Sequence, residues 1–358
     1  MESHSAYKKT WQRFRRNRPA LLGLWFVATA VFISVFGYAL APDNSPNTNA
    51  QIPEIALQPP GFSVAILPVK TNLDAPSSSW ISVLLNGQAL SYKPIPIEPS
   101  TLKTAGDSAH FQYFGKNGRW SSVPTAQLES QEIQTRHFPL GTDKYGRCIL
   151  SRLILGFRVS LLVGLIAVII SLSIGVAIGA AGGYFGGRVD DLAMLVMNTV
   201  WSIPTLLLVF AVVLALGRGI GIIFLAVGLT MWVEVARVVR GQVLVIKQLA
   251  FVEAAQSMGL GHRSILLRHI LPNLLGPVMV VAAGNFATAI LVESGLSYLG
   301  FGVQPPAPSW GTMLNENYGY ALGGKPLLAL APALAIAFTV LAFNLVGNGL
   351  RDALDVRN

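Results

Sequence analysis

The chain has 358 residues, of which 52% are hydrophobic and only 12% charged, and its formal net charge is +9. Soluble globular proteins carry about 25% charged residues, so this composition argues against that class and favours a membrane protein. The basic residues flank apolar runs without a nucleic-acid-binding signature, so no nucleic acid partner is expected. The single cysteine, Cys148, excludes an intrachain disulfide and a Cys-rich metal site, and we expect no cofactor.

Six apolar runs predict transmembrane helices, because about 20 helical residues cross a bilayer core of about 30 Å. They lie at 19–42, 159–187, 192–217, 219–239, 269–292 and 326–350. Glu234 and Arg237 interrupt the run that begins at Gly219. We still count it as a span, because long charged side chains can reach the cytoplasmic interface.

The first run follows a basic N-terminus and ends in a motif, Ala39-Leu40-Ala41, that resembles a signal-peptide cleavage site. The apolar stretch from Leu21 to Leu40 is longer than the about 7–15 residues of a signal core, so we expect an uncleaved anchor at 19–41. The basic residues that precede it are Lys8, Lys9, Arg13, Arg15, Arg16 and Arg18. They predict that residues 1–18 lie in the cytoplasm of an inner-membrane protein, and six spans return the tail, 351–358, to the same side.

Two other segments test this orientation. The loop 239–268 is basic and falls in the cytoplasm, as expected. Residues 141–158 fall outside yet carry Lys144, Arg147, Arg152 and Arg158 against Asp143, so they disagree with it. We keep the topology, because the first helix and the short loops mainly set orientation.

The segment 42–140 falls outside the membrane by this count and is rich in Pro, Ser, Asn and Thr. The string WISVLLNGQALSYKPIPI within it is typical of strands and turns, with Asn86-Gly87 as a candidate hairpin corner. The segment is too long for a connecting loop, so it predicts a small β-rich extracytoplasmic domain. A partly disordered insertion is the alternative.

Small and polar residues inside the runs suggest how the helices meet. Three glycines share four-residue spacing and predict close helix packing: Gly175, Gly179 and Gly183. Three amides need partners in place of water: Asn198, Asn285 and Asn344. These amides either line a translocation pathway or form interhelical hydrogen bonds. Pro204 either kinks the third span or marks a re-entrant entry.

The common catalytic motifs are missing from the sequence. There is no phosphate-binding GxxxxGK[ST], no HExxH, no GxSxG and no acidic pair within a run that would indicate a proton relay. No catalytic residue is expected. If the chain moves a solute, the energy is expected to enter from another polypeptide.

The string FVEAAQSMGLGHRSILLRHILPN, residues 251–273, is a charged segment between apolar runs. Four apolar residues share the spacing of one helix face: Phe251, Ala254, Ala255 and Met258. Gly259 and Gly261 are expected to end this helix, Ser264 to cap a second one, and Pro272 to turn the chain into the next span. Such a two-helix knob at the cytoplasmic surface fits a partner's groove, and the alternative is a helix resting on lipid headgroups.

The spacing of Glu253-Ala254-Ala255, Gly259, His269 and Leu271-Pro272 resembles the EAA loop of ABC importer permeases. Three further strings resemble the dipeptide and oligopeptide permeases of the DppC/OppC type: GTDKYGRCILSRLILGFRVSLLVG at 141–164, ARVVRGQVL at 236–244 and LSYLGFGVQPPAPSWGTML at 296–314. The resemblance covers about 1–41 and 141–358. It departs from the family at Cys148, where Asp is usual, and at the enlarged segment 42–140.

The resemblance implies an all-α polytopic membrane protein with one N-terminal helix and a five-helix permease core at 141–350. It implies the permease subunit of an ATP-driven importer of peptides or a related small solute, with ATP hydrolysis in its partners. Those partners would be a second homologous permease, two ABC ATPase subunits and an extracytoplasmic substrate-binding protein, assembled in a lipid bilayer. The alternatives are a secondary transporter or channel that works without an ATPase, and a membrane-anchored assembly protein.

The resemblance also assigns roles within a coupling loop at about 250–273. Glu253 and Gly259 would shape the coupling helix, and Ala254 and Ala255 would permit close approach of the ATPase. Pro272 would orient the following span. His269 stands at the variable position, where it either contacts the ATPase or packs beneath the loop.

Overall fold

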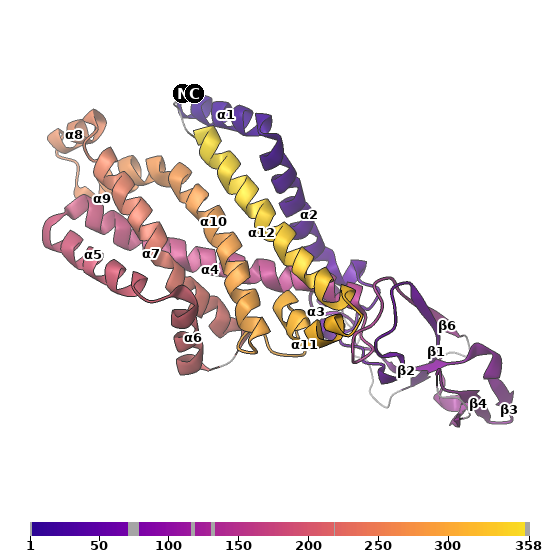
Figure 1. Ribbon diagram of the computed structural model, residues 1–358. Coiled ribbons are helices and arrows are strands. Elements are labelled where there is room, and N and C mark those ends of the chain that lie inside the picture. Colours follow the sequence, from indigo (N-terminus) through magenta and orange to yellow (C-terminus); the bar gives the residue numbers. More distant parts are fainter. Residues whose placement is uncertain (1, 71–78, 116–118, 130–132, 218, 355–358) are drawn as a thin grey trace. The chain divides into compact units, whose positions relative to one another are not determined.

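The structure is a computed structural model, and it describes residues 2–70, 79–115, 119–129, 133–217 and 219–354 (Figure 1). Most of the tail, 355–358 with Arg357, therefore lies outside the described residues. The chain divides into two compact units. We call Met1–Ala30, Ser160–Gln304 and Leu334–Asn358 the helical unit, and Val31–Val159 and Pro305–Ala333 the insertion unit.

Among the described residues, five helices are long and apolar enough to cross a membrane. They contain α2 (Arg18–Leu40), α4 (Ile149–Phe185), α7 (Ile220–Ile246), α10 (Leu271–Tyr298) and α12 (Leu327–Leu354). The shorter helices of the membrane runs and their flanks are α1 (Glu2–Arg16), α5 (Gly187–Trp201), α6 (Thr205–Leu216), α8 (Ala250–Ser257), α9 (His262–Ser264) and α11 (Trp310–Leu322). The run that begins at Gly219 is therefore helical through Glu234 and Arg237, as predicted.

The predicted third span, 192–217, is broken. Helices α5 and α6 meet at 89° across 202–204, and Pro204 directly precedes α6. Proline cannot donate the helical hydrogen bond and restricts the residue before it, so the first helix ends there. The described residues contain five unbroken candidate spans, or six if α5 and α6 cross together, so the count of six stays a prediction.

The glycine stripe of α4 packs against α7, as predicted. A Cβ atom on Gly179 would overlap the backbone of Ala236. A Cβ on Gly183 would lie 2.9 Å from the carbonyl oxygen of Arg240. Because real Cβ atoms do not approach backbone atoms this closely, the two helix backbones can meet here only at glycine.

We expect Gly179→Ala to destabilise the helical unit by about 1–3 kcal/mol, because the added methyl overpacks the α4–α7 contact. Gly241→Ala is the matched control, since a Cβ on this helical glycine would meet nothing within 4 Å. The control substitution should be neutral or slightly stabilising. Thermal unfolding of the purified protein in detergent measures both. Equal unfolding midpoints for the two variants would contradict the packing.

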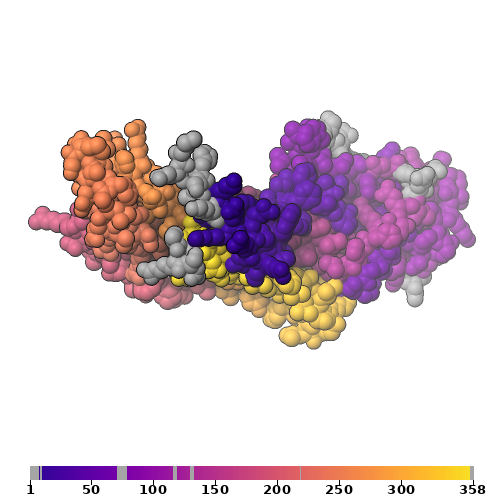
Figure 2. Space-filling view, turned by 90° about the horizontal axis from the view of Figure 1, so that it is seen from above, coloured from indigo at the N-terminus to yellow at the C-terminus, as the bar shows by residue number. Residues whose placement is uncertain are grey.

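Helix α1 is held against the end of α12 within the helical unit, as the indigo and yellow residues show in Figure 2. Phe14 is buried with Ala20 and Ala353, and Asn17 Nδ2 donates a hydrogen bond to Asp352 Oδ2 at 3.2 Å. The two ends of the described chain therefore lie together. This agrees with the prediction that they share one side of the membrane, although the side itself stays a prediction.

The insertion unit contains two three-stranded antiparallel sheets, in the orders β2-β1-β6 and β3-β4-β5. The strands are β1 (Phe62–Lys70), β2 (Tyr92–Ile97), β3 (Lys103–Ala105), β4 (Ser108–Gln112), β5 (Trp120–Pro124) and β6 (Gln134–Phe138). All six strands fall within the predicted segment 42–140. Its location outside the membrane stays a prediction.

The central strand β1 is buried on both faces. Ala65 and Leu67 join one apolar cluster with Phe111 of β4, while Val64 and Ile66 join a second cluster with Cys148 at the start of α4. Alternate side chains of a strand point to opposite faces, so β1 links two hydrophobic cores. The described residues of the insertion therefore pack around two apolar clusters.

The predicted hairpin at Asn86-Gly87 is wrong. Residues Trp80–Asn86 form a short helix, α3, and Gly87 ends it with φ of +78°. The apolar residues of WISVLLN fit a helix face as well as a strand, since short apolar runs do not distinguish the two periods. The second half of the string, β2, is a strand as predicted, and its prolines are tolerated because β2 lies at the sheet edge.

Candidate functional site

The candidate site begins with α8, which is fixed to the helical unit by one face. Val252 and Ala255 are 0% and 1% exposed and pack into an apolar cluster with residues of α4, α7 and α10. The opposite side is exposed, including Phe251 at 42% and Met258 at 72%. The four residues predicted to share one helix face therefore do not share it. Ala255 points inward, whereas Phe251, Ala254 and Met258 point outward.

We call the exposed side of α8 the coupling face, comprising Phe251, Glu253, Ala254 and Met258. It combines two large apolar side chains with one carboxylate on a helix whose other side is buried. Exposed apolar groups on a rigid helix are typical of a surface that another protein covers.

Gly259 ends α8, as predicted. Its φ is +75°, and the backbone N–H of Leu260 donates to the carbonyl of Ala255 at 3.2 Å. Only glycine adopts this left-handed conformation without strain. Gly261, by contrast, has φ of −65° and caps the next helix instead of ending α8, so that part of the prediction is wrong.

The prediction of a separate second helix in the knob is also wrong. Ser264 lies inside α9, not at its cap, and α9 continues through a π-helical turn, η5 (Ile265–Ile270), into α10. His262–Tyr298 runs as one 37-residue helix without a break, with Pro272 in the first turn of α10, and the orienting role of Pro272 stays a prediction. Proline is tolerated in the first turn of a helix, and the wide π turn before Pro272 adapts to its missing N–H. The knob is α8 alone.

His269 lies on η5, half-buried, and its carbonyl accepts a hydrogen bond from Asn273 Nδ2 at 2.7 Å.

A second set of polar contacts holds the start of α9. The hydroxyl of Tyr184 lies 3.0 Å from His262 Nδ1, and Lys247 Nζ donates to the Tyr184 carbonyl at 2.6 Å. Sequence spacing could not have revealed Tyr184, because its partners are remote in sequence. It joins the ends of α4 and α7 to the segment that follows α8.

The three amides within the apolar runs have different environments. Asn285 is 1% exposed and its Nδ2 donates to the Met231 carbonyl at 3.4 Å, which links α10 to α7. Asn198 Oδ1 accepts from Arg237 Nη2 at 2.9 Å. Asn344 lies on an exposed side of α12. Asn285 and Asn198 thus form interhelical hydrogen bonds, which is one of the two predicted alternatives. Asn344 stays a candidate for pathway lining.

Arg237 of α7 has partners within the helical unit, and its predicted reach to the cytoplasmic interface stays a prediction. Its guanidinium lies over the Trp201 ring, 3.9 Å from the ring centroid, at the end of α5 next to the bend. The aromatic face and the Asn198 oxygen replace water around the charge. Arg240, one turn further along α7, forms an ion pair with Asp190 of α5, with nitrogen–oxygen distances of 2.5 and 2.6 Å.

A buried acid was missed at the sequence level. Glu293 is 0% exposed in α10, and its Oε1 accepts from Ser297 Oγ at 2.7 Å. Ser297 Oγ in turn accepts from the backbone N–H of Val303 at 3.0 Å, so the acid supports the loop after α10. The signal was visible, since Glu293 directly follows the predicted run 269–292.

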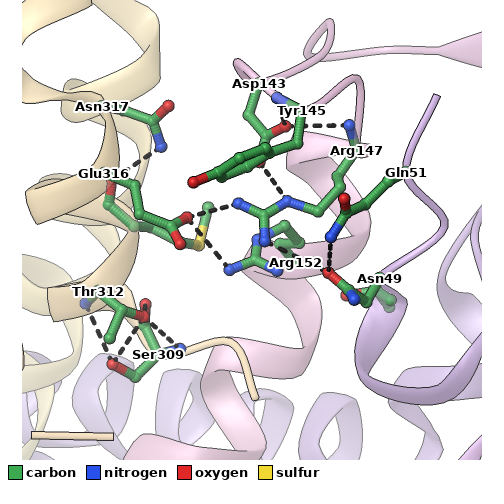
Figure 3. A network of polar contacts seen from close by, with 12 residues as sticks. Asn49, Gln51, Asp143, Tyr145, Arg147, Arg152, Ser309, Thr312, Glu316 and Asn317 are labelled. Carbon is green, nitrogen blue, oxygen red and sulfur yellow. Dashed lines mark hydrogen bonds and ion pairs between the residues drawn. The ribbon is translucent and has the colours of Figure 1, made fainter. Parts of the chain in front are cut away.

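The basic segment 141–158 contains a buried charge network within the insertion unit (Figure 3). Arg147 Nε bonds to Asp143 Oδ2 at 2.6 Å, and Arg147 Nη2 bonds to Glu316 Oε2 of α11 at 2.5 Å. Arg152 Nη2 lies 3.5 Å from the same Glu316 oxygen. Arg147 and Arg152, which count against the predicted orientation, therefore both have acidic partners within the insertion unit.

Cys148 lies outside this network although it is adjacent to it in sequence. It is 2% exposed among Val64, Ile66 and Phe138, and burial raises the pKa of its thiol. An aspartate at this position would place a carboxylate in that apolar cluster. The cysteine side chain fits this apolar cluster. Arg152, four positions later, pairs with Glu316 of α11.

Two family profiles match the chain. The family described as binding-protein-dependent transport system inner membrane component matches residues 154–358, more than half of the chain. The chain belongs to this family. The N-terminal transmembrane domain of oligopeptide transport permease C matches residues 5–60. Residues 61–153 of the permease, which contain both sheets, lie between the two matches.

Curated relatives of the permease agree with this assignment. The glutathione transport system permease protein GsiD of Escherichia coli O1:K1 is 45% identical over 215 residues, 60% of this chain and 71% of that one. The oligopeptide transport system permease protein OppC of Salmonella typhimurium is 43% identical over 251 residues, 70% and 80% of the two chains. OppC of Escherichia coli K12 is 43% identical over 239 residues, 67% and 77%.

The predicted family resemblance is thus confirmed. The permease is a multi-pass inner-membrane subunit of an ABC transporter, and the secondary transporter or channel is disfavoured.

Proposed function

We propose that the permease forms half of the translocation pathway of an ATP-driven importer of peptides or a related small solute. Its relatives are named as oligopeptide and glutathione permeases, and glutathione is itself a small peptide. The observation that carries the coupling proposal is α8, whose Val252 and Ala255 are buried while Phe251 and Met258 are exposed. A helix fixed on one side and apolar on the other suits transmission of movement from a docked ATPase.

The roles within α8 follow from this arrangement. Glu253 offers a charge to the ATPase, and Ala254 allows its backbone to come close because it is small. Ala255 acts from the buried side by fixing α8, and Gly259 sets the turn that ends it. His269, half-buried on η5, packs beneath this surface, and Pro272 lies in the first turn of α10.

The assembly that we propose contains a second homologous permease, two ABC ATPase subunits and an extracytoplasmic substrate-binding protein. An apolar groove of about 540 Å³ supports the second permease as a partner, because it lies along α4 and α10 and is lined by Leu172, Val176, Ala180, Leu267, Leu271 and Val278. ATP hydrolysis would reside in the ATPase subunits.

The topology that we propose has six crossings. Residues 1–18 and 351–358 lie in the cytoplasm, and residues 42–140 lie outside. The core, 141–350, contains the remaining five crossings, with α5 and α6 together counted as one. The join between α1 and the end of α12 supports placing both termini on one side.

Uptake into proteoliposomes tests the function. The assembled transporter is reconstituted with its binding protein, and accumulation of radiolabelled glutathione and trialanine is measured with wild-type ATPase or with ATPase whose phosphate-binding lysine is replaced. We expect at least one peptide to accumulate with the wild-type ATPase only. Equal accumulation with both ATPases would refute ATP-driven transport, and exclusion of both peptides would refute the peptide class.

A further inference from the structure

The short helix α3 carries exposed apolar side chains that the domain around it does not use. Trp80 is 75% exposed, and Ile81 and Leu85 are each 50% exposed. At about 100° per residue these three positions fall within about 140° of the helix circumference, so the exposed side chains share one side of α3. Among the described residues, the two apolar clusters of the β-sheets include none from α3. Helix α3 therefore contributes an apolar surface and little core.

The C-terminal end of α3 is fixed against the ends of two membrane helices. Arg158 Nη1 of α4 donates to the carbonyl of Leu85 at 2.7 Å, which places a cation at the negative end of the α3 dipole. The same guanidinium lies 5.8 Å from the centroid of the Tyr38 ring in α2. Directly after α3, a Cβ on Gly87 would come within 2.7 Å of the Tyr38 ring, so only glycine allows this close approach.

These contacts fix the depth of α3 relative to the bilayer. Tyr38 lies 20 residues after Arg18, the first residue of α2, and at 1.5 Å per residue this is about the 30 Å thickness of the hydrocarbon core. Arg158 directly precedes the apolar run 159–187. Helix α3 thus lies where α2 and the run 159–187 leave the hydrocarbon.

The chemistry of α3 fits that depth. The string WISVLLN has no charged residue, so a protein partner would find no charge to pair on α3. Tryptophan is enriched where hydrocarbon meets headgroups, because its ring is apolar and its N–H needs a polar partner. We propose that α3 is an interfacial helix, with Trp80, Ile81 and Leu85 inserted into the lipid leaflet beside α2. It holds the insertion against the membrane surface.

A fluorophore at position 81 tests this proposal. Ile81→Cys is made in a Cys148→Ala background, labelled with an environment-sensitive nitrobenzoxadiazole group, and the full-length permease is placed in nanodiscs. The control is Trp120→Cys, an exposed position on β5. In Figure 1, β4, the partner strand of β5, lies apart from α3 within the insertion unit. Quenching is measured with doxyl-labelled lipid and with aqueous iodide.

We expect the label at 81 to be quenched mainly by doxyl lipid and the label at 120 mainly by iodide. Iodide quenching at 81 equal to that at 120, without doxyl quenching, would overturn the proposal. Shielding from both quenchers would also overturn it, since that result indicates a protein partner. Leu85→Cys provides a second labelled position. If Cys148→Ala folds poorly, Cys148 is retained, because its thiol is buried and its raised pKa slows alkylation.

Discussion

Replacing Glu253 with lysine is expected to abolish coupled transport while the permease stays folded. Glu253 lies on the exposed coupling face, whereas α8 is held in place by the buried Val252 and Ala255. Reversing a charge within a protein interface leaves the partner's charges opposed, and we expect ATPase affinity to fall on the order of a hundredfold. Co-purification of the ATPase with the permease and its stimulated ATP hydrolysis measure the effect.

Two controls separate coupling from folding. Glu253→Gln keeps the size of the side chain and is expected to lose much less affinity. Glu129→Lys reverses an exposed charge in the insertion, where Glu129 accepts a hydrogen bond from Ser91, and should leave the ATPase bound. Wild-type amounts of bound ATPase with normal stimulated hydrolysis in Glu253→Lys would refute the role of the coupling face.

Glu316→Ala is expected to destabilise the insertion unit by about 3–5 kcal/mol. Arg147 and Arg152 are each 3% exposed at the side chain, and both contact the Glu316 carboxylate. Its removal leaves two buried guanidinium groups with Asp143 as the remaining acid of the network. The free energy of unfolding is followed through Trp310, which is buried at the start of α11 and packs edge-on against Phe157.

The matched variants test whether charge or packing is responsible. Glu316→Gln keeps the shape and should give an intermediate loss. Arg152→Met combined with Glu316→Leu removes a charge of each sign, and this pair should be closer to wild type than Glu316→Ala, since removing both partners leaves fewer uncompensated charges. A loss below about 0.5 kcal/mol in Glu316→Ala, typical of surface substitutions, would contradict the buried network.

The apolar runs could be located from the sequence because hydrophobic length is a local property. The ends of the helices could not be located in this way. The run predicted at 159–187 became a helix from Ile149, since Arg152 and Arg158 are tolerated in it through Glu316 and the Leu85 carbonyl, which are remote in sequence. The charge count of the basic segment 141–158 misses these contacts for the same reason. Charge counts treat every arginine as exposed, whereas these two have internal partners.

The insertion was predicted as β-rich from its length and composition, and its described residues form two sheets. The helix α3 was mistaken for a strand because seven apolar and small residues carry too little periodicity to decide. The bend at Pro204 was expected, but its size, 89°, depends on tertiary packing.

The coupling segment was predicted in part. Gly259 was identified because a helix end favours a left-handed residue, which is a local requirement. The inward side of α8 could not be identified, because Val252 and Ala255 are buried by residues of other helices. The contact between Tyr184 and His262 was missed for the same reason, since 78 positions separate the two residues.

Site-specific cross-linking most directly tests whether α8 is the surface that docks the ATPase. Met258, 72% exposed on the coupling face, is replaced by cysteine in the Cys148→Ala background and labelled with a photoactivatable cross-linker in the assembled transporter. Trp120→Cys in the insertion serves as the control. We expect an ATPase adduct from position 258 and none from position 120. An assembled, active transporter without an ATPase adduct from position 258 would contradict docking through α8.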